Sequence, residues 1–230
     1  MLTKKLALLG FGNAGQAFAK MLLQKKEAIK AQYGYDVIVT AIATNSKGNL
    51  VDPEGIDLKE VLEDLEKCGK FCNQTQLTQK TTIEIVKEAD YDVLVEMTPL
   101  NIFTGQPAIE HIETAFDRNK DAITANKGPI AWKFSELRQK AREKGVKFFY
   151  ETTVMDGTPV FNFAEKTLQM ATVTEVSGIL NSTTILFSKN WQLAQTTTIL
   201  WPEAVRWASL KRTLRWILKD TTPQQKLRHF

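Results

Sequence analysis

Lys127 is the residue of this sequence whose surroundings most clearly predict catalysis. It lies between Asn126 and Gly128, two residues after the predicted strand 121–125. At the end of a strand, a lysine can polarise a carbonyl oxygen or donate a proton to it. The alternative is an ordinary solvated lysine in a loop. The sequence therefore gives Lys127 as a candidate catalytic residue.

Three glycines with the spacing G-x-G-x-x-G follow an apolar run, 6–9, and precede a helix-forming segment. In a strand–turn–helix, such glycines permit a tight turn, close backbone approach to a pyrophosphate, and close packing of helix on strand. The N–H groups that begin the helix would face the phosphates. A turn that merely joins a strand to a helix is the alternative. The predicted cofactor-binding residues are Gly10, Phe11, Gly12, Asn13, Ala14 and Gly15.

The type of dinucleotide is predicted from the loop after the second predicted strand, 36–43. An NAD site usually has an acid there, about 20 residues past the glycines, to bind the ribose 2′-hydroxyl. This loop has none and contains Asn45 and Lys47 instead. Both tolerate a 2′-phosphate, so the sequence favours NADP over NAD. Lys47 as a plain solvated loop lysine remains the alternative.

The elements that must position these residues alternate along the chain. Further strands are predicted at 91–97, 121–125 and 146–150, and helices at 56–67, 107–116 and 135–144. This alternation predicts an α/β fold with a doubly wound, Rossmann-like parallel sheet, in which ligands bind at the carboxyl ends of the strands. Thr98 follows one such end, and it either caps the next helix or contacts the nicotinamide ribose.

Composition narrows the class of protein. The chain has 230 residues, 43% of them hydrophobic, which is enough for a sizeable core. We find no apolar run of about 18 residues and no secretory leader, so we expect a cytoplasmic protein that binds neither membranes nor nucleic acid. Cys68 and Cys72 have no second cysteine pair and no nearby histidine, and we interpret them as incidental thiols rather than zinc ligands.

Four motifs, in this order, resemble those of homoserine dehydrogenases: 10–15, 124–129, 151–159 and 178–184. The resemblance covers residues 1–184. It implies NAD(P)-dependent interconversion of aspartate 4-semialdehyde and L-homoserine, on the pathway to threonine and methionine. It also implies a homodimer, with an NAD(P)-binding domain at 1–150 and, at 151–184, the start of a truncated α/β substrate and dimerisation domain.

The resemblance further implies roles for individual residues. The glycine turn would hold the cofactor, Thr98 would lie near its nicotinamide, and Lys127 would be at the reaction centre. A sodium ion would be bound by Glu151 and the backbone carbonyls of Val154, Asp156 and Thr158, oxygen ligands that suit a hard cation. The substrate pocket would be lined by Gly178, Asn181 and Thr183, although Asn181 and Thr183 are also suited to capping a helix.

Residues 185–230 differ from the rest of the chain. They hold eight Lys/Arg against two Asp/Glu, four of the five tryptophans and none of the twelve glycines, whereas 1–184 carry 22 bases and 24 acids. The family continues with G-F-x-E-A-D-P, a further Asp and D-x-x-x-K, whose acids bind the substrate ammonium and whose Asp and Lys handle protons. None of this occurs in the tail. A catalytically inactive remnant that at most binds nucleotide is therefore the alternative to an active oxidoreductase.

The residues of the tail are compatible with the missing motif in another reading frame. When the third base of each codon is joined to the first two bases of the next, the Trp207/Ala208 junction must give Gly and the Trp216/Ile217 junction must give Asp. Permitted codons from Trp207 to Lys226 can spell G-F-V-E-A-D-P-T-M-D-I-E-G-Y-D-T-A-A-K. We infer a single-base slip near Thr184. A basic amphipathic helix at 207–219, able to bind an acidic partner or a membrane surface, is the alternative.

The inferred single-base slip predicts what the coding DNA of the tail contains. We expect the shifted frame from codon 185 onward to encode that motif and to continue with family-like sequence. Sequencing of the coding region in all three forward frames checks this, with the frame of codons 1–184 as the internal reference. A shifted frame without the motif would refute the hypothesis and make the basic helix the account of the tail.

Overall fold

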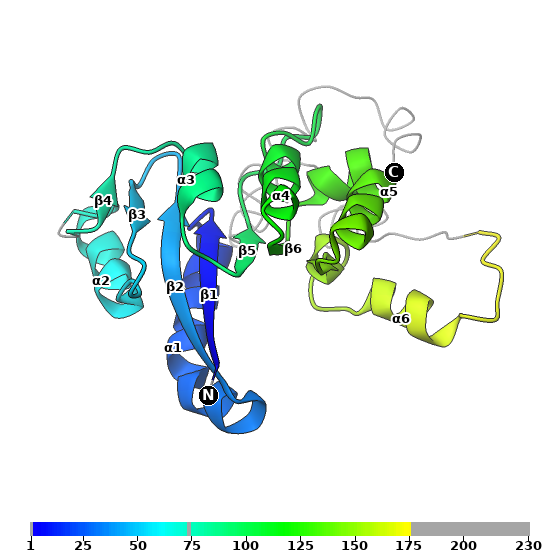
Figure 1. Cartoon of the computed structure of the whole chain (residues 1–230), viewed down its shortest axis with the longest axis horizontal. Helices are drawn as coiled ribbons and strands as arrows, with labels where there is room; N and C mark the ends of the chain where they lie inside the picture. Colours follow the sequence, from blue (N-terminus) through cyan, green and yellow to red (C-terminus); the bar gives the residue numbers. More distant parts are fainter. Residues whose placement is uncertain (1, 73–74, 176–230) are drawn as a thin grey trace, which may run out of the picture. The chain divides into compact units, whose positions relative to one another are not determined.

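The structure of the chain is a computed structural model that describes residues 2–72 and 75–175. The chain forms two compact units, Met1–Gln169 and Met170–Phe230. All helices and strands of the described residues belong to the first unit (Figure 1). Its strands are β1 (Leu2–Leu9), β2 (Tyr35–Ala43), β3 (Asn49–Val51), β4 (Leu77–Thr78), β5 (Val93–Glu96), β6 (Asp121–Thr124) and β7 (Phe148–Phe149). Its helices are α1 (Asn13–Tyr33), α2 (Leu58–Cys68), α3 (Thr82–Glu88), α4 (Ala108–Asp117), α5 (Lys127–Lys144) and α6 (Val160–Thr167), with a 3₁₀ turn at Glu151–Thr153.

The strands form one sheet in the order β4-β3-β2-β1-β5-β6-β7. The five strands from β2 to β7 in this order are parallel, whereas β3 and β4 pair antiparallel at one edge. The order reverses between β1 and β5, which is where a doubly wound sheet opens a crevice for ligands. The predicted fold class is confirmed. The antiparallel edge was not predicted, because strands of two and three residues carry too little periodicity.

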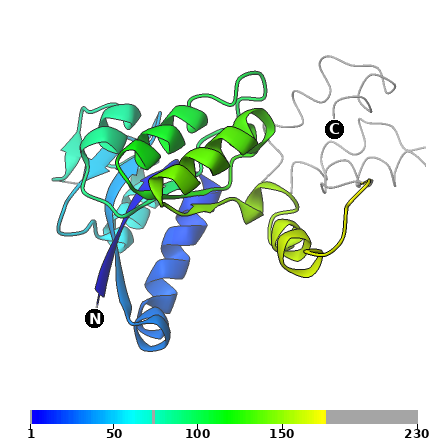
Figure 2. The ribbon, with the colours of Figure 1, turned by 45° about the vertical axis from the view of Figure 1, so that its right-hand side comes forward.

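Helices cover both faces of the sheet (Figure 2). On one face, α1 and α2 pack on a cluster that includes Leu8, Ile42 and Val61. On the other, α3, α4 and α5 pack on a cluster that includes Leu94 and Phe116. Within the described residues, none of these helices combines the length and the apolar character needed to cross a membrane.

Helix α5 begins eight residues earlier than predicted. The sequence indicates a helix at 135–144, which is only the part that follows a kink at Lys133 (φ −143°, ψ 34°). The first part starts at Lys127, because the Asn126 side chain accepts the Gly128 N–H and caps the helix. Lys127 is therefore the first residue of a helix and not a loop residue. The predicted strand 146–150 shortens to β7.

Two helices were missed by the sequence analysis. Helix α3 begins with a capping box, in which Thr81 accepts the Glu84 N–H and the Glu84 carboxylate accepts the Thr81 N–H. The T-x-x-E spacing of these residues was a usable signal. Helix α6 begins after Pro159, whose side chain cannot cap a helix. Its sequence therefore gave no comparable signal.

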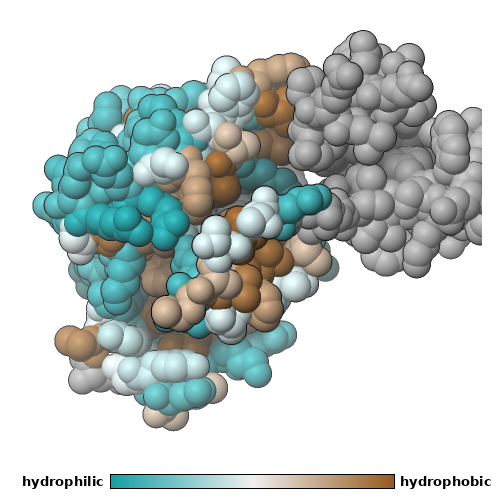
Figure 3. Space-filling view, turned by 90° about the vertical axis from the view of Figure 1, so that its right-hand side faces the viewer, coloured by the Kyte–Doolittle hydropathy of each residue, from teal (hydrophilic) through white to brown (hydrophobic). Residues whose placement is uncertain are grey.

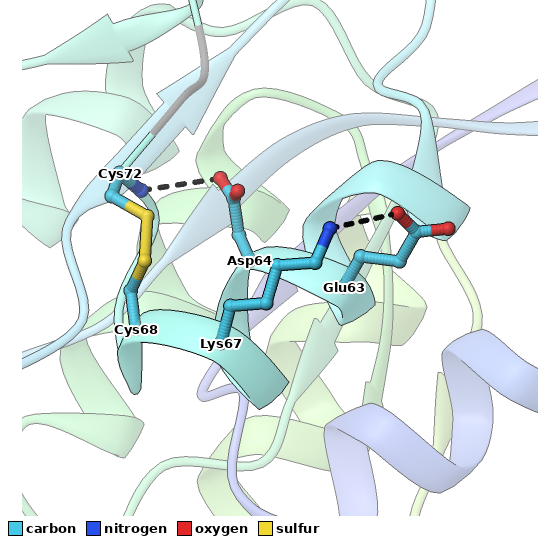
Figure 4. The surroundings of a disulfide bond; sticks show 5 residues. All are labelled: Glu63, Asp64, Lys67, Cys68 and Cys72. Atoms are coloured by element: carbon cyan, nitrogen blue, oxygen red, sulfur yellow. Dashed lines mark hydrogen bonds and ion pairs between the residues drawn. A yellow bond between two sulfur atoms is a disulfide. The ribbon is translucent and has the colours of Figure 1, made fainter.

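The interpretation of Cys68 and Cys72 as incidental thiols is wrong, since the structure joins them in a disulfide (Figure 4). Cys68 is the last residue of α2, and Gly69 follows in the left-handed conformation (φ 70°). This turn reverses the chain and brings Cys72 back beside the helix end. The backbone N–H of Cys72 also donates to the buried Asp64 carboxylate at 3.1 Å. The disulfide thus closes a small loop around Phe71.

One face of the sheet carries exposed apolar residues near its β7 edge. Val95, Ile123 and Phe149 are directly paired across β5, β6 and β7, so their side chains point to the same face. Val95 is buried against the α1 side, whereas Ile123 is 36% and Phe149 52% exposed. Figure 3 shows apolar surface beside hydrophilic surface on this side of the molecule. Among the described residues, the α1–α2 layer therefore ends before β6 and β7.

A buried histidine on α4 makes the stability of the fold depend on pH. His111 is 2% exposed, and its Nδ1 has no hydrogen-bond partner among the described residues. Burial lowers the pKa of His111 from 6.5 to about 4. The unfolded chain therefore binds a proton at this residue more readily than the folded chain in that range.

We expect the stability of the protein to fall as the pH drops from about 6.5 to about 4, with His111 accounting for up to about 3 kcal/mol. Urea unfolding at a series of pH values measures this. The variant His111→Leu removes the titrating group, and its free energy of unfolding is expected to depend less on pH in this window. An unchanged pH dependence would show that His111 is not buried as a neutral imidazole.

Candidate functional site

The glycine turn follows β1 at the carboxyl edge of the sheet, and its glycines differ in what they contact. Gly10 has φ +87°, and a Cβ there would overlap the Met97 carbonyl and lie 2.9 Å from the Thr98 nitrogen. A Cβ on Gly15 would lie 2.6 Å from the Gly10 oxygen. Gly12 has no atom within 4 Å of the equivalent position. Close packing therefore leaves no room for a side chain at Gly10 or Gly15, whereas Gly12 leaves open space above the turn.

The start of α1 lies directly after Gly12 in the glycine turn. No side chain caps it, and its first turn has no acidic residue. The starts of α2, α3 and α5 are capped by Asp57, Thr81 and Asn126 respectively. Gly12, Asn13 and Ala14 are exposed at the uncapped end. The positive end of the α1 dipole thus faces the open space beside Gly12.

Lys47 is fixed onto the glycine turn. Its Nζ donates to the Phe11 carbonyl at 2.7 Å, and its own carbonyl accepts the Phe71 N–H at 2.9 Å. The Phe11 and Phe71 rings pack edge to face, with centroids 6.0 Å apart. The half-buried Lys47 is therefore a structured neighbour of the turn and not a freely solvated lysine.

A groove of about 480 Å³ adjoins this lysine. It lies between α1, the loop after β2, and α2. Three of its lining residues are basic, namely Lys20, Lys47 and Lys59, and two are acidic, Glu63 and Glu66. The basic side chains make the groove suitable for a phosphate next to the glycine turn.

Thr98, Asn126 and Lys127 meet at the neighbouring strand ends. The Asn126 Nδ2 donates to the Thr98 carbonyl at 3.0 Å, which joins the loop after β5 to the start of α5. Gly128 packs there against Gly105, since a Cβ on Gly128 would lie 2.9 Å from the Gly105 Cα. Lys127 is exposed, and its side chain has no hydrogen bond or ion pair to any described residue.

Glu96 is the site residue that sequence reasoning missed. It is the last residue of β5, is fully buried, and accepts hydrogen bonds from the Thr98 N–H at 2.9 Å, the Thr98 hydroxyl, and the Thr124 hydroxyl at 3.1 Å. Burial raises the pKa of Glu96 above its ordinary value, and hydrogen bonds from Thr98, Thr124 and Asn126 oppose that shift. The usable signal was an acid that ends an otherwise apolar strand, Val93–Glu96.

The predicted sodium ligands follow β7 and are distant in sequence from the glycine turn. The Glu151 carboxylate accepts the Phe161 and Asn162 N–H groups at 2.9 and 3.0 Å and so caps α6. The Thr158 carbonyl accepts the Val160 N–H at 2.8 Å. Val154 and Asp156 lie in the same loop, with Asp156 at φ +50°. The Glu151 carboxylate and the Thr158 carbonyl thus accept hydrogen bonds within the chain, and the sodium ion stays a prediction from the resemblance.

The predicted substrate residues Gly178, Asn181 and Thr183 lie outside the described residues, as does the tail 185–230. Their roles stay predictions.

Comparison with known proteins identifies the family. Residues 10–151 match the family model described as "Homoserine dehydrogenase, NAD binding domain". This chain belongs to the homoserine dehydrogenase family. The matched range includes the glycine turn, Thr98 and Lys127, so the predicted resemblance is confirmed.

Relatives and solved structures agree with this family. The homoserine dehydrogenase of Methanocaldococcus jannaschii is 40% identical over 77% of this chain and 52% of its own length. The NAD(+)-dependent homoserine dehydrogenase of Pseudomonas canavaninivorans is 32% identical over 78% of this chain and 51% of its own. A putative homoserine dehydrogenase structure from Archaeoglobus fulgidus is 33% identical, with a TM-score of 0.61 over 73% of this chain and 48% of that chain.

A hyperthermophilic archaeal homoserine dehydrogenase mutant in complex with NADPH is 28% identical, with a TM-score of 0.62 over 73% of this chain and 50% of that chain. The chain thus spans about half the length of these homoserine dehydrogenases. A nicotinamide cofactor fits the glycine turn described above, because the turn combines open space at Gly12 with an uncapped helix start.

Substitutions at Gly12 and Gly10 distinguish an effect on cofactor binding from an effect on folding. We expect Gly12→Ala to fold normally, because the residue has φ −79° and open space for a Cβ, but to bind NADPH about tenfold more weakly. Gly10→Ala, at φ +87° and against Met97, is expected to lower the melting temperature instead. Thermal unfolding and a fluorescence titration with NADPH measure both effects. Unchanged NADPH affinity in Gly12→Ala would contradict the placement of the pyrophosphate.

Proposed function

We propose that this chain binds NADP(H) at the glycine turn and catalyses, as a homoserine dehydrogenase-type oxidoreductase, the interconversion of aspartate 4-semialdehyde and L-homoserine. The reaction would serve threonine and methionine biosynthesis in the cytoplasm. The homodimer implied by the family is part of the proposal. Its support begins with family membership, since the relatives that match are named homoserine dehydrogenases.

One contact carries the proposal. Gly10 lies against the peptide that joins Met97 to Thr98, so the glycine turn and the loop after β5 touch. The Thr98 carbonyl in turn accepts from Asn126, which caps the helix that Lys127 begins. A dinucleotide with its pyrophosphate over Gly12 would therefore extend along the same edge that presents Lys127.

The chemistry required of the chain is modest. Bound NADPH supplies a hydride to the aldehyde carbon. The Lys127 ammonium would hold the carbonyl oxygen through a hydrogen bond and give it a proton as the alkoxide forms. Two observations support this role: Lys127 is exposed at the carboxyl edge, and its side chain has no partner among the described residues. Because Lys127 is the first residue of α5, the capped start of that helix fixes the position of its backbone.

The preference for NADP rests on Lys47. Relatives include one named as NAD(+)-dependent and a structure with NADPH, so the family alone does not decide the nucleotide. Lys47 is held at the glycine turn through Phe11, and Lys20 and Lys59 line the adjoining groove. A 2′-phosphate placed there would meet positive charge, and the loop has no acid to repel it.

A second candidate function is nucleotide binding without turnover. The observation that favours it is the sequence 185–230 as translated, which lacks the acids and the second lysine that the family uses for the substrate. Loss of several members of one catalytic unit would remove most of the rate. Under this candidate, the glycine turn still binds nucleotide.

Two measurements test the proposal. Titration with NADPH and NADH is expected to show tighter binding of NADPH, by about tenfold, and Lys47→Ala should remove most of this difference. Lys25→Ala is the matched control, because Lys25 is exposed on the same helix as Lys20 but about 18 Å along it from the turn. Reduction of aspartate 4-semialdehyde is followed by loss of NADPH absorbance, in wild type and in Lys127→Met.

The outcomes separate the candidates. NADPH consumption that Lys127→Met abolishes supports the dehydrogenase, whereas binding without consumption supports the second candidate. No binding of either nucleotide would refute both. Equal affinity for NADPH and NADH in wild type would refute the NADP preference alone.

A further inference from the structure

Glu96 is a buried acid without a counter-ion among the described residues. Its exposure is 0%, and no described Lys, Arg or His forms an ion pair with it. A buried carboxylate costs free energy unless several hydrogen bonds replace its water. Donors that do so here are the Thr98 N–H and hydroxyl at one oxygen, and the Thr124 hydroxyl at the other. No part of the proposed reaction assigns a task to this residue.

The carboxylate joins segments that are distant in sequence. Thr98 lies in the loop after β5, and Thr124 ends β6. The Thr124 hydroxyl oxygen also accepts the Asn126 N–H at 3.0 Å, and Asn126 donates to the Thr98 carbonyl at 3.0 Å. Asn126 then accepts the Gly128 N–H at 3.0 Å and starts α5. One side chain therefore fixes two strand ends and, through Asn126, the helix that begins with Lys127.

The same contacts set the polarity of Thr98. Its hydroxyl hydrogen points inward to Glu96, so the lone pairs of the oxygen are left for other groups. Thr98 is partly exposed, and its nitrogen lies close to Gly10 at the edge of the glycine turn. A group placed beside Thr98 would thus meet a hydrogen-bond acceptor. The nicotinamide carboxamide N–H and the ribose hydroxyls are donors of this kind.

We infer that Glu96 is a positioning residue for the nicotinamide end of the bound cofactor, acting through the Thr98 hydroxyl and, by way of Asn126, the start of α5. The inference rests on the proposed NADP(H) site. It concerns one half of the dinucleotide, because the contacts of Glu96 lie at β5 and β6, whereas Lys47 and the groove adjoin β2 and α2.

The test compares a whole cofactor with its adenosine half. NADPH and adenosine 2′,5′-bisphosphate are titrated into wild type and variants, and the melting temperature of each variant is recorded. Glu96→Met keeps the volume but frees the Thr98 hydroxyl to turn outward. We expect it to bind NADPH about tenfold more weakly and to bind the bisphosphate within about twofold of wild type. Glu96→Gln can still accept from Thr98, so it should bind NADPH within about threefold of wild type.

Two further variants complete the design. Asp64→Leu also replaces a buried carboxylate by an apolar side chain, but on α2, where the carboxylate accepts the Cys72 N–H. Its ratio of affinities for the two ligands should equal that of wild type. Thr98→Val removes the hydroxyl while Glu96 keeps the Thr98 N–H and Thr124, and it should reproduce the selective loss. If Glu96→Met does not fold, Thr98→Val still tests the inference.

Each outcome is decisive. Selective loss of NADPH affinity in Glu96→Met and Thr98→Val supports the inference. Equal loss of both ligands, or no loss of NADPH affinity, overturns it, as does a wild type that binds NADPH no more tightly than the bisphosphate. A wild type that binds neither ligand refutes the proposed NADP(H) site itself, which is a different failure.

Discussion

The close approach of Gly10 to the peptide between Met97 and Thr98 is the constraint on which the site depends. There is no room for a side chain at this point, so β1 and β5 can end at the same level only if residue 10 is glycine. Their common end lies where the order of the sheet reverses, which is the place where doubly wound sheets bind ligands. The glycine turn, Thr98 and the cap of α5 then follow from neighbouring strand ends. The site is therefore a consequence of sheet packing before any ligand contributes.

Much of this arrangement could be predicted from the sequence, because it is carried by strong local signals. The apolar runs of β1, β2 and β5 and the glycine spacing specify a strand–turn–helix and a parallel sheet. The lack of an acid after β2 and the lysine after Asn126 predict roles for Lys47 and Lys127. Family motifs supplied the identity, which the match at 10–151 confirms.

What could not be predicted depends on contacts between distant residues. Nothing local to Glu96 shows that Thr124, 28 residues later, will donate to it. Lys47 reaches Phe11 only because β2 lies beside β1. The disulfide depends on a left-handed glycine between its cysteines, and spacing alone gave the wrong interpretation. Sequence periodicity reports which face of an element is buried, but it does not report which polar groups pair across the sheet.

The hydrogen-bonded group of Glu96, Thr98, Thr124 and Asn126 has a consequence for how such a sequence can vary. Each member hydrogen-bonds to another, and Glu96, Thr124 and Asn126 are buried, so changing one leaves a buried polar atom without a partner. Substitutions within the group will not have additive effects. Across a set of related sequences, these four positions would therefore change together or not at all, as one inherited unit spread over two strands.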